Sequence, residues 1–172
     1  MNNKRISKGL WVWGQFDKDS TKTLTNLKKK LDMQLKGPFF DIHITLCGPL
    51  ENFNNNSRKK LKDISSRLSP IKLLSEDIQT KEEFFQSLFI KIKEDKSLLN
   101  IKKKIDNQFA MPSKKYFPHI SLYYGEEDKE KKTNAIKQLD KFNNIFLLEK
   151  LCIVDVDEEI SSWKILETYS LL

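Results

Sequence analysis

The sequence has few cysteines and no long apolar run. Its two cysteines, Cys47 and Cys152, are fewer than a small secreted chain built on disulfides would use, so we expect two buried free thiols. The apolar run near the start, residues 10–13, is too short for the core of a signal peptide or for a membrane span. We therefore expect a cytoplasmic protein with no membrane partner.

Histidine is equally scarce, with His43 and His119 as the only two in the chain. Two imidazoles are too few ligands for zinc, and no H-x-x-x-H or C-x-x-C spacing supplies more. We therefore expect no metal and no other cofactor. No low-complexity linker interrupts the chain, and its 172 residues fit one domain spanning 1–172.

Positive charge exceeds negative charge, with a formal net charge of +7. This excess suits an anionic substrate but does not require one. The basic residues gather in four clusters, at 28–30, 58–60, 102–104 and 129–132. All four fall on segments with helical periodicity, so solvated helix faces are the simpler interpretation. A nucleic-acid surface would need the clusters to converge on one face, and that alternative stays open.

Hydrophobic periodicity predicts an α+β chain. The expected strands cover residues 10–16, 39–47, 71–79, 84–93, 118–124, 145–156 and 162–171. The expected helices cover residues 17–35, 61–68, 97–109 and 128–142. Ser97 is a candidate N-cap for the third helix, Gly48-Pro49 is expected to end the second strand, and a polar loop is expected over 52–57.

The two histidines lie in two similar segments, Asp-Ile-His-Ile-Thr-Leu and Pro-His-Ile-Ser-Leu-Tyr. Side chains alternate along a strand, so His43 and Thr45 share one face, and His119 and Ser121 share one face. Two such strands facing each other would form a symmetric pocket with two imidazoles and two hydroxyls. The alternative, that each histidine is an ordinary polar residue of a half-buried strand, does not explain why the two segments match.

This set of side chains suits the hydrolysis of a phosphodiester. Imidazole can act as base toward water or as acid toward the leaving oxygen near neutral pH. Hydroxyl donors can hold the non-bridging phosphate oxygens without a metal. Cys47 lies two residues beyond Thr45 and is expected on the same strand face, but nothing in the sequence favours a thiolate. An ordinary strand residue is the simpler interpretation of Cys47.

The paired motifs resemble the two-histidine (2H) phosphoesterase superfamily, and within it the cyclic phosphodiesterase branch known from plants and yeast. Segments at 11–13, 84–89, 111–125 and 162–164 support the resemblance, which spans nearly the whole chain. It implies an α+β, bilobal fold in which two antiparallel sheets face each other across a central cleft. Helices lie outside, and each lobe supplies one motif.

The resemblance also implies an activity and a site. The branch hydrolyses nucleoside 2′,3′-cyclic phosphates and ADP-ribose 1″,2″-cyclic phosphate without a metal. The implied catalytic residues are His43 and His119, and the implied substrate-binding residues are Thr45, Ser121, Trp13 and Tyr124. The branch favours His119 as base and His43 as acid, although the sequence alone does not separate the two roles.

Two alternatives remain beside this interpretation. One is an RNA-directed member of the same superfamily that cuts 2′-5′ linkages or processes RNA ends. The other is a non-catalytic nucleotide- or RNA-binding module. A closed pocket would favour a small anionic cyclic phosphate as the partner, whereas an open basic groove would favour RNA. We expect a monomer.

Overall fold

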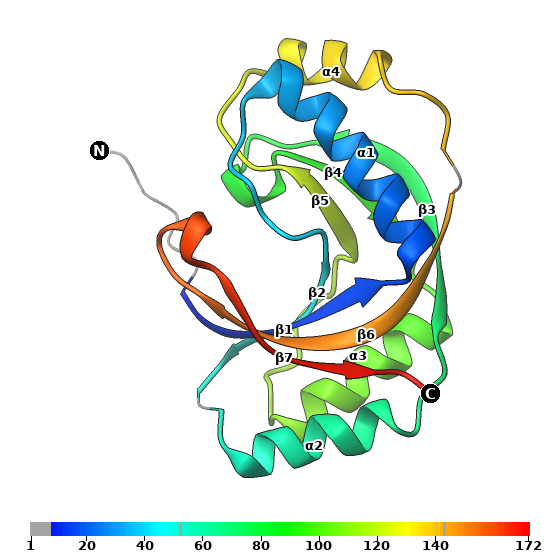
Figure 1. The fold of residues 1–172 in the computed structure, drawn as a ribbon, viewed down its shortest axis with the longest axis vertical. Helices are drawn as coiled ribbons and strands as arrows, with labels where there is room; N and C mark the ends of the chain where they lie inside the picture. The colour runs from blue at the N-terminus through cyan, green and yellow to red at the C-terminus, as the bar shows by residue number, and fades with distance from the viewer. Residues whose placement is uncertain (1–7, 52, 143) are drawn as a thin grey trace.

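The computed structural model describes residues 8–51, 53–142 and 144–172 (Figure 1). Its strands are β1 (Gly9–Phe16), β2 (Ile44–Leu50), β3 (Ile71–Thr80), β4 (Leu88–Ile92), β5 (His119–Tyr123), β6 (Ile145–Val156) and β7 (Lys164–Ser170). Its helices are α1 (Lys18–Leu35), α2 (Asn55–Ser65), α3 (Lys96–Gln108) and α4 (Lys129–Lys137). Two short 3₁₀ turns, η1 (Phe84–Gln86) and η2 (Ile160–Ser162), precede β4 and β7.

The strands form one antiparallel sheet rather than two separate sheets. Their order is β1-β2-β5-β4-β3-β6-β7, and β1 also pairs with β6. The long strand β6 connects distant parts of this sheet, because it pairs with β1, β3 and β7. On the other side, β2 meets β5 at the pair Ile44↔Ile120. The α+β class is confirmed, and the division into two lobes stays a prediction.

The helices lie in two pairs at opposite ends of the molecule (Figure 1). Helix α1 packs on β5 and α4, whereas α3 packs on β2 and on α2. The predicted apolar stripe of α1 is confirmed, since Leu24, Leu27, Leu31 and Leu35 are all buried. Within the described ranges, no helix combines the length and the apolar composition needed to cross a membrane.

Helix starts follow side-chain capping. Asp17 accepts a hydrogen bond from the backbone N–H of Ser20 and begins α1. Asp95, not Ser97, begins α3, because its carboxylate accepts from the N–H of Leu98. The prediction for Ser97 was therefore wrong by two residues.

Other expected boundaries also differ from the structure. The second strand begins at Ile44, and it continues through Gly48-Pro49 because Leu50 still pairs with Leu10 of β1. The loop expected at 52–57 is shorter, since Asn54 caps α2, and Asn52 lies outside the described residues. Helix α4 ends at Lys137 rather than at residue 142.

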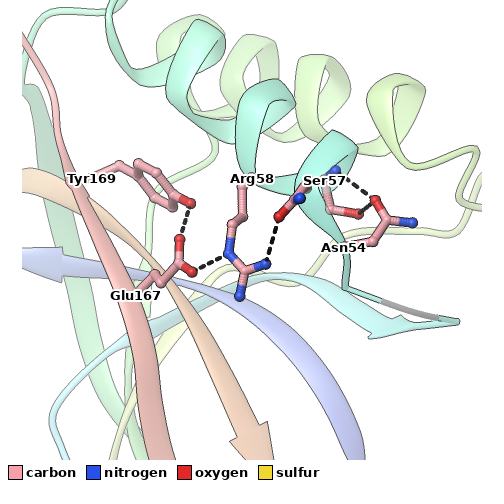
Figure 2. A network of polar contacts seen from close by, with 6 residues as sticks. Asn54, Ser57, Arg58, Glu167 and Tyr169 are labelled. Atoms are coloured by element: carbon pink, nitrogen blue, oxygen red, sulfur yellow. Dashed lines mark hydrogen bonds and ion pairs between the residues drawn. The ribbon is translucent and has the colours of Figure 1, made fainter.

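A polar network attaches α2 to β7 (Figure 2). Arg58 of α2 contacts the carboxylate of Glu167, which also accepts from the hydroxyl of Tyr169. The same guanidinium donates to Asn55 Oδ1 at 3.2 Å. Because Arg58 and Glu167 keep substantial solvent exposure, we expect the ion pair to contribute at most about 1 kcal/mol.

Not every clustered lysine lies on a solvated face. Lys28 and Lys132 are only 4% and 2% exposed. The ammonium of Lys28 donates to Asp32 and to the carbonyl of Pro38, and it lies 4.2 Å from the ring centre of Phe40. Periodicity identifies these helices, but it does not show which lysines a neighbouring element will cover.

Candidate active site

The two histidine motifs meet where β2 and β5 touch. Ile44 and Ile120 are fully buried and form the pair that joins the two strands. In an antiparallel register, this pair places His43 across from Ser121 and Thr45 across from His119. The four polar residues alternate with the buried isoleucines, so they emerge on one face. All four line one cavity of about 250 Å³.

A common local contact holds both imidazoles. His43 Nδ1 lies 2.6 Å from the carbonyl oxygen of Asp41, and His119 Nδ1 lies 2.9 Å from that of Phe117. A carbonyl oxygen can only accept, so Nδ1 carries the proton in each ring. The unprotonated nitrogen of each neutral ring is therefore Nε2, which is the atom free to exchange a proton with a substrate.

His43 is enclosed by aromatic rings. It is 5% exposed and stacks on Trp13 with 3.5 Å between ring centres and 3° between planes. Phe40 meets it edge-on. Burial lowers the pKa of His43 to about 4, the hydrogen bond to Asp41 opposes this change, and the charge of His119 adds to it. His43 is therefore neutral near pH 7 in the free enzyme.

His119 lies against Phe89 and Phe117, with ring centres 5.4 and 5.5 Å away. Burial is the main cause that lowers its pKa, and the hydrogen bond to Phe117 opposes it. Two charged neighbours act in opposite directions, because Lys81 lowers the pKa and Glu83 raises it. Both imidazoles thus favour the neutral form when no anion is bound.

The hydroxyl groups of the site sit beside the imidazoles. Ser121 is buried, its Oγ donates to the carbonyl of Phe85 at 3.3 Å, and it also hydrogen-bonds the hydroxyl of Tyr124. Burial raises the pKa of Tyr124, so its phenol stays protonated and can donate. The carbonyl of Thr45 accepts from the Tyr116 hydroxyl at 3.0 Å, which fixes this part of β2.

A tryptophan near the C-terminus completes an aromatic wall. The ring of Trp163 lies 5.8 Å from Trp13 and 5.9 Å from both Phe85 and Tyr124. Its indole N–H donates to the carbonyl of Asp157 at 2.8 Å, which fixes the ring after η2. The distance along the chain hides this contact from sequence reasoning.

The structure brings every predicted site residue to the same cavity. The lining that sequence reasoning did not assign consists of Trp11, Phe85, Gln86, Val156 and Trp163. Most of these residues fall in segments that carried the family resemblance, at 11–13, 84–89 and 162–164. That resemblance was the available signal, although it gave no role for the individual side chains.

Cys47 does not share the face of Thr45. The β1–β2 register shifts between Val12↔Cys47 and Trp13↔Thr45, so an irregularity separates the two residues. Cys47 packs in the core and hydrogen-bonds Asp106 of α3, and burial raises the pKa of its thiol to about 12. The expected shared face was wrong, and a core position accounts for the residue. Both cysteines are buried and free, as predicted.

A second, larger cavity of about 990 Å³ shares Phe85 with the histidine cavity. Six carboxylates and two ammonium groups line it, from Glu82, Glu126, Glu127, Asp128, Glu158, Glu159, Lys129 and Lys132. It contains neither histidine, so it is not the cavity on which the two histidine motifs converge. In the part of the chain that the structure describes, no three His, Cys, Asp or Glu side chains group as metal ligands.

Comparison with known proteins gives matches over nearly the whole chain. A family described as "Cyclic phosphodiesterase-like protein" matches residues 6–171. A protein of Arabidopsis thaliana named "Cyclic phosphodiesterase" is 23% identical over 166 residues, which cover 93% of this chain and 92% of the relative.

Solved structures with a similar fold cover nearly the whole chain as well. Escherichia coli LigT complexed with 3′-AMP has a TM-score of 0.63 at 14% identity and covers 95% of this chain and 98% of its own. The protein TT0787 of Thermus thermophilus has a TM-score of 0.62 at 14% identity and covers 94% of this chain and 97% of its own. At this identity the likeness establishes the shared 2H phosphoesterase fold. Taken with the family match, it shows that this phosphodiesterase belongs to the cyclic phosphodiesterase branch of the two-histidine phosphoesterases.

Proposed function

We propose that this enzyme opens small cyclic phosphates to phosphomonoesters by metal-independent acid/base catalysis. The proposed substrates are nucleoside 2′,3′-cyclic phosphates, ADP-ribose 1″,2″-cyclic phosphate, or both. The observation that carries the proposal is the convergence of two imidazoles and two hydroxyls on one cavity of about 250 Å³. The buried free thiols suit a reducing compartment, so we propose a cytoplasmic monomer.

The proposed mechanism divides proton transfer between the two Nε2 atoms. One neutral imidazole takes a proton from the attacking water, and the other, as imidazolium, protonates the departing oxygen. The pKa of His43, lowered to about 4, means that a bound phosphate must raise this pKa before His43 can act as the acid. The anionic substrate supplies that effect, because a negative charge favours the imidazolium.

The hydroxyls and the aromatic wall hold the substrate in this proposal. Thr45 donates to a non-bridging phosphate oxygen, and Ser121 donates to another once its single O–H turns from the Phe85 carbonyl to the substrate. Trp13 and Tyr124 are 3% and 4% exposed, so they offer cavity-facing edges to the base or sugar rather than free ring faces. Trp163 is more exposed and extends this apolar wall.

The larger cavity of about 990 Å³ forms a groove beside the histidine cavity, and its charge favours a small molecule over RNA. Its six carboxylates and two ammonium groups give it a net negative charge, which repels the phosphates of a polynucleotide. Structures of the similar protein LigT are complexed with 3′-AMP, ATP, NADP⁺ and phosphate. These complexes support a nucleotide-sized ligand for this fold. An RNA-directed activity is the second candidate, favoured only by the net charge of +7.

A substrate panel in the presence of EDTA tests the proposal. It contains nucleoside 2′,3′-cyclic phosphates, ADP-ribose 1″,2″-cyclic phosphate and short oligonucleotides, with products identified by phosphorus NMR. We expect turnover of the small cyclic phosphates, and a roughly 10²–10⁴-fold loss in His43→Ala and in His119→Ala. Thermal melting checks that each variant folds. Turnover within a few-fold of wild type in either variant, or activity lost in EDTA and restored by a divalent ion, contradicts the mechanism.

A further inference from the structure

Gln86 lies on η1 and lines the catalytic cavity together with His119 and Ser121. The ammonium of Lys81 donates to Gln86 Oε1 at 2.6 Å. An ammonium group has no acceptor atom, so the oxygen end of the amide must be the end that faces Lys81. The end left for the cavity is Nε2, which carries two N–H donors.

A buried lysine fixes the segment that carries this pair. Lys132 of α4 is 2% exposed and donates to the carbonyl of Lys81 at 2.7 Å and to Ser87 Oγ at 3.3 Å. The backbone N–H of Lys81 also donates to the carbonyl of Ser87 at 3.2 Å. Residues 81 and 87 are therefore tied together on either side of Gln86.

The ammonium of Lys81 is also held on its far side. It lies 4.2 Å from the ring centre of Phe117, whose carbonyl orients His119. A cation bound at Oε1 polarises the amide and strengthens the N–H groups at its other end as donors. The arrangement thus leaves a strengthened neutral donor on a side chain that lines the cavity together with His119 and Ser121.

We propose that Gln86 is a third donor to the phosphate, beside Thr45 and Ser121, and that Lys81 is the positioning residue that orients its amide. This inference rests on the proposed function, because it assigns the phosphate of the cyclic substrate to this cavity. Lys81 does not itself line the cavity, so it would act on the phosphate through Gln86, apart from its direct effect on the pKa of His119.

Binding of inorganic phosphate, followed by phosphorus NMR titration, tests the donor without turnover. We expect Gln86→Ala to weaken phosphate binding about tenfold and to lower kcat/KM roughly 10–100-fold. Gln86→Glu keeps an oxygen for Lys81 but replaces the donor by negative charge, so we expect a larger loss than in Gln86→Ala. Gln79→Ala is the control, because it removes an amide on β3 that lines neither cavity. We expect it to keep the wild-type phosphate affinity and kcat/KM.

A double-mutant cycle tests the positioning role. Lys81→Met also removes a charge that lowers the pKa of His119, so each variant is measured at its own pH optimum. There Lys81→Met should lower kcat/KM in the wild-type background and change it less than twofold in the Gln86→Ala background, because the remaining effect passes through the amide. Melting temperatures close to wild type exclude a loss of fold as the cause of the change in binding. Equal effects of Lys81→Met in both backgrounds overturn the positioning role.

Wild-type phosphate affinity and kcat/KM in Gln86→Ala overturn the donor role. The binding titration also separates this inference from the proposed function. If the wild-type protein binds phosphate but opens no cyclic phosphate, the proposed activity fails. The comparison of phosphate affinity between wild type and Gln86→Ala still decides whether Gln86 is a donor. A wild-type protein that binds no phosphate overturns the inference itself.

Discussion

At the scale of single residues, the two imidazoles share a backbone contact but differ in their neighbours. Each donates Nδ1–H to a carbonyl two residues earlier. His43 has an aromatic plane stacked on it, whereas His119 also interacts with the charges of Lys81 and Glu83. Burial lowers both pKa values, so the two proposed catalytic imidazoles favour the neutral form in the free enzyme.

The pH dependence of kcat/KM follows from these pKa directions. The proposed mechanism needs one neutral and one protonated imidazole. In the free enzyme both pKa values lie below 6.5, that of His43 near 4. At low pH both imidazoles are protonated, and above pH 6.5 both are neutral, so the required combination of one neutral and one protonated ring is lost at each end. We expect a bell-shaped profile of kcat/KM with its maximum below pH 6.5, measured by steady-state kinetics.

The profile of kcat alone should lie at higher pH, because the bound phosphate stabilises the imidazolium. A kcat/KM maximum above pH 7.5, or a profile with a single limb, would contradict the two roles. His43→Ala and His119→Ala are the matched controls, since each should remove one limb from the residual activity.

The hydroxyls of Thr45 and Ser121 provide a second residue-scale prediction. A donor that strengthens toward the transition state contributes roughly 2–4 kcal/mol, so Thr45→Ala and Ser121→Ala should be impaired yet active. Thr45→Ser and Ser121→Thr keep the hydroxyl and should be nearly normal in kcat/KM. Full activity in the double Ala variant, or a phosphoryl group trapped on either side chain, would show that these residues are not donors.

At the scale of elements, the sequence predicts what local patterns determine. The apolar stripe of α1 and the alternation of side chains around His119 could be predicted from the sequence, because hydrophobic periodicity and helix capping are local properties. The irregularity that turns Cys47 away from Thr45 could not be predicted in this way, because it arises in the pairing of β2 with β1. Trp163 and Gln86 reach the cavity through contacts across the chain, and no spacing rule encodes such contacts.

Strand β1 pairs with both β2 and β6, and its packing is tight at Gly14. An added Cβ there would lie 2.4 Å from Leu148 Cδ1 and 2.9 Å from Ile44 Cγ2. We expect Gly14→Ala to lower the free energy of unfolding by roughly 1–3 kcal/mol through overpacking. Urea unfolding measures this change, with an unchanged m-value showing that the unfolding transition is otherwise the same.

Leu148→Ala gives the matched test of that cause. Alone it should destabilise by roughly 2–5 kcal/mol by leaving a cavity. In the double variant the new methyl group occupies part of that space, so the combined loss should fall short of the sum of the two. Strict additivity would mean that contact with Leu148 is not what makes Gly14 necessary.

At the scale of the whole molecule, charge is unevenly distributed. The chain carries a net charge of +7, yet the groove beside the catalytic cavity is lined by six carboxylates and two ammonium groups. The net charge alone therefore does not predict the charge of the surface beside the cavity. The region that an extended substrate would cross repels phosphates, whereas the cavity itself presents neutral donors.

Reversing charge in the groove should admit longer substrates. Glu158→Lys with Glu159→Lys changes two exposed carboxylates of the lining without touching the cavity. We expect kcat/KM for an oligonucleotide ending in a 2′,3′-cyclic phosphate to rise about tenfold at low salt, and the gain to shrink as salt is added. The mononucleotide rate should stay within a few-fold.

Glu51→Lys with Glu130→Lys is the matched control, because it makes the same change in net charge at exposed positions outside the groove. An equal gain in this control would mean that overall charge, and not the groove, limits the longer substrate.

The pair Ile44↔Ile120 relates the two motifs by a local two-fold axis, which exchanges His43 with His119 and Thr45 with Ser121. A cyclic phosphate has two ester bonds, and a quartet with this symmetry presents the same groups to each of them. The regiochemistry of ring opening is therefore not encoded in the motifs. For the proposed substrates, we therefore expect the unlike surroundings to decide which oxygen of the sugar departs, with the stacked Trp13 on one side and the Lys81–Gln86 pair on the other.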